Sequence, residues 1–458
     1  MTDSLAQAVL AGADADVLER EPVPDRYTAA HLRVEDVGVF DGVEDKDVRR
    51  TLHVGDVPMP ELAPDEVLVA VMASSVNYNT VWSATFEPLP TFDFLRRYAR
   101  QGGWAARHDQ PYHVMGSDAA GVIVRTGNGV RRWRTGDHVV VSCTHVDDQE
   151  PATHSDGMLG ADQRIWGFET NFGGLAHYTV VRASQLLPKA AHLTWEEAAS
   201  VPLCAATSYR MLVSEHGARI KQGDVVLIWG ATGGLGAFAV QLVKNGGGIP
   251  VGVVSSEAKA DLLRRLGCDV VINRSELGMG DGGDTDGDPG RRAIEDGKRL
   301  GRIIRREVGE DPHIAFDFIG RATFATSVFL VRRGGTVVTC GSSTGYQHHY
   351  DNRYLWMNLK RIIGSHSANF QEQWECNRLV QMGRLMPALS EVHPLDRIGE
   401  ASRRVQQNLH TGKVGVLCLA PEPGLGVTDP ATRARIGEER LSPLRPQAGA
   451  TPVPALAR

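Results

Sequence analysis

The feature that most constrains the fold of this chain is the glycine-rich stretch GATGGLG, Gly230 to Gly236. It follows an apolar run, DVVLIWG, and precedes a segment with helical spacing, AFAVQLVKN. Apolar runs and helical segments continue to alternate after it, in the order IPVGVVS, SEAKADLLRRLG, DVVIN, HIAFDFIG and GGTVVTCG. Strands that alternate with helices of about ten residues form parallel βαβ units. The sequence therefore predicts a doubly wound parallel sheet.

The position of the glycines between a strand and a helix predicts a Rossmann-type dinucleotide site. Gly230 permits a tight turn, Gly233 lets the backbone approach a pyrophosphate, and Gly236 allows close helix packing. A purely structural glycine turn is the alternative. The expected contacts of this loop are Gly230, Thr232, Gly233, Gly234, Leu235 and Gly236.

The second strand of this unit indicates which dinucleotide is bound. It ends in Ser255 and Ser256, with Lys259 shortly after, where an NAD-preferring site carries an acid for the ribose hydroxyl. Hydroxyl groups and a cation suit a 2′-phosphate, so we expect NADPH. Glu257 lies between them, and we assign it to the first turn of the next helix, where acids are favoured.

The rest of the chain divides by composition. Short apolar runs between Gly, Pro and Asp turns, from residue 57 to 141, predict a compact all-β unit. We expect this β-rich domain at residues 1–204 and 374–425, and the parallel sheet at 205–373. The Gly- and Asp-rich stretch at 275–298 is expected to be a mobile loop, and the Pro-, Gly- and Arg-rich residues 426–458 a disordered tail.

Charge and cysteine content exclude several classes of function. The net charge is −6 with acids and bases interspersed, which gives no footprint for nucleic acid. No apolar run approaches about 18 residues, so no membrane partner is expected. The six cysteines form no CxxC pair and predict neither a disulfide framework nor a zinc ribbon. A cytoplasmic protein fits these features. The cationic stretch KRLGRIIRRE is either a solvated helix face or an anion site.

A β-rich unit followed by GATGGLG resembles the medium-chain dehydrogenase/reductase superfamily, which implies a GroES-like catalytic domain and a Rossmann domain. In the zinc alcohol dehydrogenases of this superfamily a cysteine follows the strand that here reads EVLVAVMA, and Gly-His-Glu comes later. This chain has SSVNYNT and Gly116-Ser117-Asp118 at those places. We therefore expect no metal, and no Lewis-acid mechanism that depends on zinc.

Four blocks resemble the crotonyl-CoA carboxylase/reductase family: SSVNYNTVW, WGFETNFGG, YDNRYLWMNLKRIIGSHSANF and HTGKVGVLCLAP. The resemblance extends to about Pro421. It implies reductive carboxylation of a 2-enoyl-CoA with NADPH and carbon dioxide to an alkylmalonyl-CoA, as in the supply of polyketide extender units, by a homodimer or homotetramer. A plain NADPH-dependent enoyl-CoA or quinone reductase and a non-catalytic NADPH-binding protein are the alternatives.

The same blocks imply roles for particular residues. The Asn79 side-chain amide resembles the donor to one carbon dioxide oxygen, and Phe168 the residue whose backbone N–H and ring complete the pocket. Glu169 resembles the acid that holds an ordered water, and His366 the partner of that water. Asn79 as a turn residue and His366 as a core histidine are the alternatives. The residues that resemble CoA-phosphate contacts are Lys298, Arg302, Arg353 and Tyr354.

Two departures from the family pattern concern the acyl chain. Ser367 stands where family members commonly have phenylalanine, and FDFIGR replaces a more usual FEHPGR. We hypothesise a wider acyl pocket that favours enoyl chains longer than crotonyl or branched ones. The alternative is that Ser367 alters only local packing.

Overall fold

The computed structural model describes residues 3–279 and 289–445, and these form two compact units. The first contains residues 3–203, 369–381 and 389–445, and the second contains 204–368 and 382–388. The expected boundaries were 204/205 and 373/374. The described residues include no helix that is long and apolar enough to cross a membrane.

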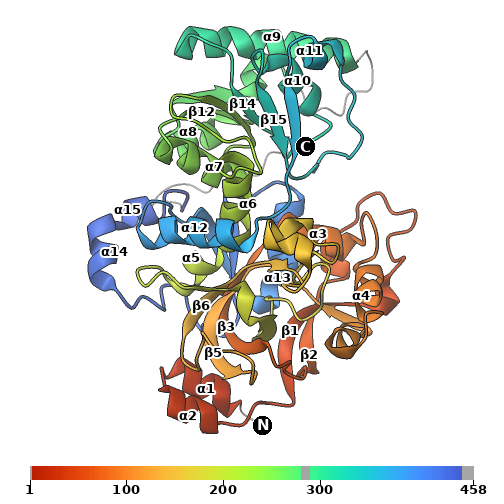
Figure 1. The fold of residues 1–458 in the computed structure, drawn as a ribbon, viewed down its shortest axis with the longest axis vertical. Helices are drawn as coiled ribbons and strands as arrows, with labels where there is room; N and C mark the ends of the chain where they lie inside the picture. Colours follow the sequence, from red (N-terminus) through yellow and green to blue (C-terminus); the bar gives the residue numbers. More distant parts are fainter. Residues whose placement is uncertain (1–2, 280–288, 446–458) are drawn as a thin grey trace. The chain divides into compact units, whose positions relative to one another are not determined.

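The first unit is built around strand β3 (Glu66–Val76), whose eleven residues are all buried. Its sheet has seven strands in the order β10-β6-β5-β3-β18-β17, and β9 also pairs with β3. Strands β3, β5 and β6 of this sheet are labelled in Figure 1. The other strands of this sheet are β5 (Ala120–Thr126), β6 (His138–Val141), β9 (Tyr178–Arg182), β10 (Leu186–Pro188), β17 (Leu389–Pro394) and β18 (Lys413–Leu417).

Two smaller sheets complete the β structure of this unit. The order in the first is β2-β1-β4, and β7 pairs with β8 in the second. Their strands are β1 (Arg26–Arg33), β2 (His53–Pro58), β4 (Tyr112–Val114), β7 (Thr144–His145) and β8 (Arg164–Ile165).

The region expected to be all-β also contains two helices, α3 (Tyr78–Thr85) and α4 (Thr91–Ala99). Helix α4 buries Phe92, Leu95 and Tyr98, which recur every three residues and so lie on one helical face. The other helices of this unit are α1 (Ser4–Leu10), α2 (Ala15–Arg20), α5 (Trp195–Ala199), α12 (Phe370–Gln381), α13 (Ile398–Gln406), α14 (Pro430–Ile436) and α15 (Glu438–Leu441).

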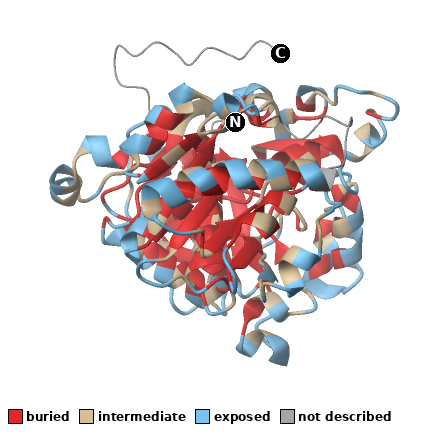
Figure 2. Ribbon diagram, turned by 90° about the horizontal axis from the view of Figure 1, so that it is seen from above, coloured by how far each residue is buried: buried red, intermediate tan, exposed pale blue. Residues whose placement is uncertain are grey.

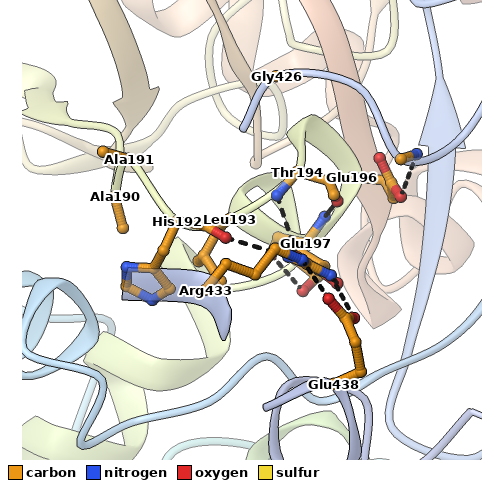
Figure 3. Close-up of polar contacts among 12 residues, drawn as sticks. Ala190, Ala191, His192, Leu193, Thr194, Glu196, Glu197, Gly426, Arg433 and Glu438 are labelled. Carbon is orange, nitrogen blue, oxygen red and sulfur yellow. Dashed lines mark hydrogen bonds and ion pairs between the residues drawn. The ribbon is translucent and has the colours of Figure 1, made fainter. Parts of the chain in front are cut away.

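The prediction of a disordered tail is wrong for residues 426–445. This segment contains α14 and α15, and the Arg433 guanidinium donates to both carboxylate oxygens of buried Glu197 (2.7 and 3.1 Å) (Figure 3). Arg433 also contacts Glu438, and Leu441 and Leu444 are buried. Composition missed this because the anchoring acid lies more than 200 positions earlier in the chain. Residues 446–458 lie outside the described residues.

The second unit has the predicted Rossmann topology. Six parallel strands follow the order β13-β12-β11-β14-β15-β16, which is the 3-2-1-4-5-6 arrangement of a doubly wound sheet. Figure 2 shows buried residues concentrated in the strands and exposed residues on the helices and loops around them. The strands are β11 (Val225–Trp229), β12 (Ile249–Val254), β13 (Val270–Asn273), β14 (Ile314–Phe316), β15 (Thr336–Thr339) and β16 (Arg361–Gly364).

The helices of this unit correct the loop prediction at 275–298. Helix α9 begins at Pro289, within that stretch, and continues to Val308. Proline is tolerated in a first helical turn, and buried Ala293, Leu300 and Ile304 supply the apolar face that stabilises the helix. Residues 280–288 lie outside the described residues. The remaining helices are α6 (Pro202–Leu212), which contains the unit boundary, α7 (Gly234–Asn245), α8 (Glu257–Arg265), α10 (Phe324–Leu330) and α11 (Arg353–Trp356).

Candidate functional site

The glycine loop joins β11 to the N-terminus of α7. Gly230 has a φ of 58°, the left-handed conformation that favours glycine. A Cβ at Gly236 would lie 2.4 Å from the Gly230 carbonyl oxygen, so the helix can approach the strand only without a side chain. A Cβ at Gly233, the N-cap residue of α7, would meet nothing closer than 3.2 Å. The loop thus leaves the helix N-terminus accessible for an anion.

The other loop residues surround this turn. Thr232 is buried, whereas Gly234 and Leu235 are half-buried in the first turn of α7. The Leu235 carbonyl accepts a hydrogen bond from Ser208 (3.0 Å). Phe318, from the departing FDFIGR segment, places its ring 3.1 Å from where a Cβ of Gly230 would be. A side chain at Gly230 would therefore also crowd this ring.

The residues expected at the 2′-phosphate lie at the end of β12. Ser256 is the N-cap of α8 and accepts from the Lys259 backbone N–H, and Ser255 is half-buried beside it. Burial, and then the charge of Arg274, lower the pKa of Lys259. Glu257 pairs with Arg264 in the same helix (2.8 Å). The acid is thus engaged within α8, as the sequence analysis expected.

Arg274 is a functional candidate that the sequence analysis missed. It follows β13, and β13 pairs with β12 in parallel register, so their carboxyl ends lie at the same edge of the sheet. The Ser275 hydroxyl next to it donates to the Ser255 carbonyl (2.7 Å). The sheet topology could have predicted this candidate. In a doubly wound sheet the residue that follows β13 lies beside the end of β12, because the two parallel strands are neighbours.

The four CoA-phosphate candidates lie on two elements that pack against the same residue, Phe329 of α10. A Cβ at Gly297 of α9 would lie 2.3 Å from the Phe329 ring, and Tyr354 of α11 meets that ring edge to face, with centroids 4.8 Å apart. Lys298 is adjacent to Gly297, and Arg302 follows one turn later.

The three cationic side chains among these four residues differ in whether they contact an acidic residue. Lys298 and Arg302 are exposed, and neither forms an ion pair within the described residues. Arg353 is also exposed and makes a forked contact with Asp351, with distances of 2.6 to 3.1 Å. Lys298 and Arg302 therefore form the more available cationic surface.

Asn79 lies in the first turn of α3, and its side-chain amide donates to the Ser117 hydroxyl (2.8 Å). The preceding Asn77 occupies the N-cap position but makes no side-chain cap. It instead donates to Asp118 (2.7 Å) and accepts from Lys413. The Asn77 side chain therefore faces a buried ion pair, while its carbonyl accepts from the Thr80 N–H at the start of α3 (3.0 Å).

The loop containing Phe168 and Glu169 packs against the segment that carries Ser117. The Gly116 N–H donates to the Gly167 carbonyl (3.2 Å), and a Cβ at Gly167 would lie 2.0 Å from the Gly116 oxygen. On the other side, Trp82 of α3 lies beside Phe168, with ring centroids 6.5 Å apart. These two contacts bring Asn79, Phe168 and Glu169 into one region of the first unit.

The ring of Phe168 belongs to an aromatic cluster. Phe94 of α4 lies 5.8 Å from it, and Tyr78 lies 5.3 Å from Trp82, both measured between centroids. The Phe168 N–H donates to the Ile165 carbonyl (3.2 Å) within a turn. The ring of Phe168 is thus part of an aromatic cluster, and its N–H bonds within a turn. Its role in a carbon dioxide pocket stays a prediction.

Glu169 is half-buried, and one of its carboxylate oxygens accepts from the Ile165 N–H (2.8 Å). Burial raises its pKa, while the Ile165 bond and the charges of Arg164 and Arg97 oppose this shift. Within residues 3–279 and 289–445 its second carboxylate oxygen accepts no hydrogen bond, so this oxygen can hold a water or a proton, as a group assisting proton transfer requires.

His366 and Ser367 belong to the second unit and follow the end of β16. His366 keeps exposed surface, yet burial of its imidazole, and then the charge of Arg210, lower its pKa. Its role as the partner of an ordered water stays a prediction. Ser367 is buried and adopts a left-handed φ of 46°, which is uncommon for a residue with a side chain.

The residues at the expected zinc-ligand positions do not suit a metal. Asp118 is completely buried, and its Oδ2 accepts from Lys413 (3.0 Å), Ser75 and Asn77 (2.7 Å each). A lysine ammonium thus lies against the Asp118 carboxylate, where a metal ion would have to bind, and asparagine and serine are poor zinc ligands. Across residues 3–279 and 289–445 no group of three or more His, Cys, Asp or Glu side chains could hold a metal ion.

The fold and this site define a medium-chain dehydrogenase/reductase without the zinc-ligand pattern. Residues 63–191 match the alcohol dehydrogenase GroES-like domain, and residues 234–382 match the zinc-binding dehydrogenase family.

Relatives narrow this class to one family. The chain is 53% identical to a crotonyl-CoA reductase of Streptomyces avermitilis over 90% of this chain and 93% of the relative. It is 39% identical to a crotonyl-CoA carboxylase/reductase of Cereibacter sphaeroides over 82% and 86%. This chain belongs to the crotonyl-CoA carboxylase/reductase family, as its sequence blocks predicted.

A solved structure of a 2-octenoyl-CoA carboxylase reductase from a Streptomyces species, in complex with NADP and 2-octenoyl-CoA, superposes with a TM-score of 0.94. It shares 66% sequence identity, and the match covers 96% of this chain and 99% of that one. A crotonyl-CoA carboxylase/reductase in complex with NADP superposes at 0.77 with 35% identity, covering 88% and 96%.

Proposed function

We propose that this chain catalyses the NADPH-dependent reductive carboxylation of a 2-enoyl-CoA to an alkylmalonyl-CoA. The observation that carries the proposal is the clustering of Asn79, Phe168 and Glu169 in one region that lacks a zinc-ligand set. The family relatives, with NADP and an enoyl-CoA in the 66% identical structure, support it. NADPH supplies a hydride for the β-carbon of the enoyl thioester, and the electron pair then resides on the α-carbon as an enolate.

The residues decide which electrophile this enolate meets. Carbon dioxide is small and uncharged, so only a few directed donors and the exclusion of water can position it. The Asn79 amide offers such a donor, and the rings of Phe168, Trp82 and Phe94 exclude water from it. The new carbon–carbon bond joins the α-carbon to carbon dioxide, whose oxygens become the carboxylate of the product. The carboxyl of Glu169 holds water in place through its second oxygen.

The test replaces the donor and measures the products. Asn79→Leu should retain measurable NADPH oxidation while the ratio of reduced to carboxylated acyl-CoA rises about tenfold or more, because the oriented donor is lost. Products are identified by mass spectrometry with and without bicarbonate. An unchanged product ratio would remove Asn79 from the mechanism. Undiminished turnover without bicarbonate and no alkylmalonyl product in the unaltered enzyme would instead favour a plain enoyl-CoA reductase.

The cofactor preference follows from the end of β12. We propose that Ser255, Ser256, Lys259 and Arg274 contact the 2′-phosphate of NADPH, since two cations and two hydroxyls meet there. Arg274→Ala should raise the KM for NADPH about tenfold and leave that for NADH within about twofold. A preference of the unaltered enzyme for NADH would contradict this assignment.

We propose further that the acyl chain is longer than crotonyl. The small buried Ser367 in place of the family's phenylalanine and the 66% identical structure with 2-octenoyl-CoA favour this. Ser367→Phe should lower kcat/KM for octenoyl-CoA more than for crotonyl-CoA. If the unaltered enzyme used crotonyl-CoA at least as efficiently as octenoyl-CoA, the proposal would be wrong.

The edge of the Rossmann sheet offers a surface for assembly with a second copy of the chain. Strand β16 is at the edge of the Rossmann sheet, and Trp356, Met357, Leu359 and Ile362 nearby are exposed apolar residues. We propose that β16 pairs with its copy across a two-fold axis, in a homodimer or a tetramer of such dimers. Light scattering of Ile362→Lys should then show monomers. Cys268, Cys340, Cys376 and Cys418 are free thiols, which fits the cytoplasm.

A further inference from the structure

Ser117 accepts a hydrogen bond from the Asn79 side-chain nitrogen at 2.8 Å. Ser117 has no exposed surface and lies between β4 and β5, on a segment that starts with Gly116. An asparagine amide is planar and has two N–H donors. When one donor is held by Ser117, the plane of the amide and the direction of the other donor are fixed. The free donor can then face a ligand without a search over side-chain rotations.

Ser117 directly precedes a residue of a buried ionic cluster. The next residue, Asp118, accepts through Oδ2 from Lys413, Asn77 and Ser75, and through Oδ1 from the Leu203 N–H (2.9 Å). Lys413 comes from β18, and its ammonium also donates to the Val76 carbonyl at the end of β3 (3.1 Å). Asn77 immediately precedes α3.

The Asp118 carboxylate therefore restrains the positions of both residues of the Asn79–Ser117 hydrogen bond. Through the chain it fixes the backbone that carries Ser117, and through Asn77 it fixes the start of the helix that carries Asn79. Lys413 and Asp118 are 2% and 0% exposed, so this ionic pair is shielded from water and does not rearrange freely.

We propose that Ser117 is a positioning residue for the reaction, which orients the Asn79 amide toward carbon dioxide, with the Asp118–Lys413 pair as its rigid support. The inference rests on the proposed role of Asn79. A misaligned amide places carbon dioxide less often over the enolate, so more enolate is protonated by water. Ser117 thereby controls the partition between carboxylated and reduced product and has little effect on hydride transfer.

The experiment uses the full-length enzyme with octenoyl-CoA, NADPH and a series of bicarbonate concentrations, with products quantified by mass. Ser117→Ala should raise the ratio of reduced to carboxylated product about fivefold at low bicarbonate and raise the KM for carbon dioxide similarly, as expected for one lost hydrogen bond. The kcat of NADPH oxidation should stay within about twofold. Ser117→Cys, which keeps the volume but accepts hydrogen bonds weakly, should shift the ratio in the same direction by less.

Ser200→Ala is the matched control. Ser200 is equally buried in the same unit, and its hydroxyl donates a hydrogen bond of 2.7 Å to the Glu197 carbonyl, not to Asn79. This variant should keep the product ratio of the unaltered enzyme. The inference is overturned if Asn79→Leu shifts the ratio while folded Ser117→Ala does not, or if Ser200→Ala shifts it as much as Ser117→Ala. If Asn79→Leu itself has no effect, the proposed role of Asn79 fails first.

Discussion

Asp118 in the first unit and Asp317 in the second both have no exposed surface, yet their surroundings differ. Asp118 faces the ammonium of Lys413 at 3.0 Å. Asp317 is satisfied within the described residues by neutral donors alone: the hydroxyls of Thr323 and Ser327 and the N–H groups of residues 319 and 320, at 2.7 to 3.2 Å. Burial raises the pKa of Asp317, and those hydrogen bonds oppose the shift.

The two buried carboxylates have different structural roles. Asp317 closes a turn after β14, and its partners come from that turn, from the N-cap of α10 and from α10 itself, all within ten residues. Asp118 joins β3, β18 and the start of α3, whose residues are up to 295 positions away in the sequence. A charge pair of this kind is a costly way to stabilise a fold, since desolvation offsets much of the attraction. Its position beside Ser117 and Asn79 indicates that it fixes geometry.

The largest effect is expected from breaking the ion pair. Lys413→Met leaves Asp118 buried without its cation and should lower the free energy of unfolding by about 3 to 5 kcal/mol. Urea unfolding measures this. The matched control is Lys46→Met, which removes a lysine from the exposed pair with Glu87 and should cost no more than about 1 kcal/mol. Equal costs for the two variants would contradict the comparison.

Removing both charges should cost less than removing one. In Lys413→Met combined with Asp118→Asn no buried charge is left unpaired, so we expect at least about 1 kcal/mol of the loss to be recovered. A double-mutant cycle at constant pH gives the coupling energy. Additive losses would show that the two side chains act independently.

Asp317→Asn should cost about 1 to 3 kcal/mol, because an amide cannot accept all the donors around this carboxylate. The cost should also depend on pH. A carboxyl with a raised folded pKa binds more protons in the folded than in the unfolded chain between about 3.8 and that raised value. Its contribution to stability is therefore full below the ordinary value and is lost as pH rises through the folded value.

The stability difference between the unaltered protein and Asp317→Asn should consequently shrink from acidic to neutral pH. Urea titrations at several pH values from about 4 to 8 measure it. A difference that grows with pH would reverse the sign of this prediction.

The smallest losses of stability are expected when one hydroxyl donor of either carboxylate is removed. Ser75→Ala removes one of several donors to Asp118 and should cost about 1 kcal/mol. Ser327→Ala also leaves the Trp229 indole N–H without its acceptor (2.8 Å), so we expect about 2 kcal/mol. Thermal unfolding of the two variants side by side provides the test. A larger cost for Ser75→Ala than for Ser327→Ala would contradict this prediction.

Much of the fold could be read from local sequence. The strand–glycine loop–helix pattern predicted the Rossmann sheet, and the blocks around Asn79, Phe168 and His366 predicted the family; both predictions are confirmed. Local patterns succeed here because hydrophobic period and turn residues act over a few positions. They failed for residues 426–445, where stability comes from Arg433 reaching a distant buried carboxylate.

The sequence by itself determined the class of the two domains, the family and the absence of a cysteine where zinc enzymes carry one. Only the tertiary structure showed that a buried pair of Asp118 and Lys413 lies where zinc enzymes carry their metal ligands. Lys413 lies in a block that the sequence analysis used for family resemblance alone, and Ser117 and Asp118 entered it only as replaced ligands. Their interaction depends on β18 pairing with β3, which brings an ammonium to a carboxylate 295 positions away. Such pairing minimises the free energy of the whole sheet, and no local pattern encodes it.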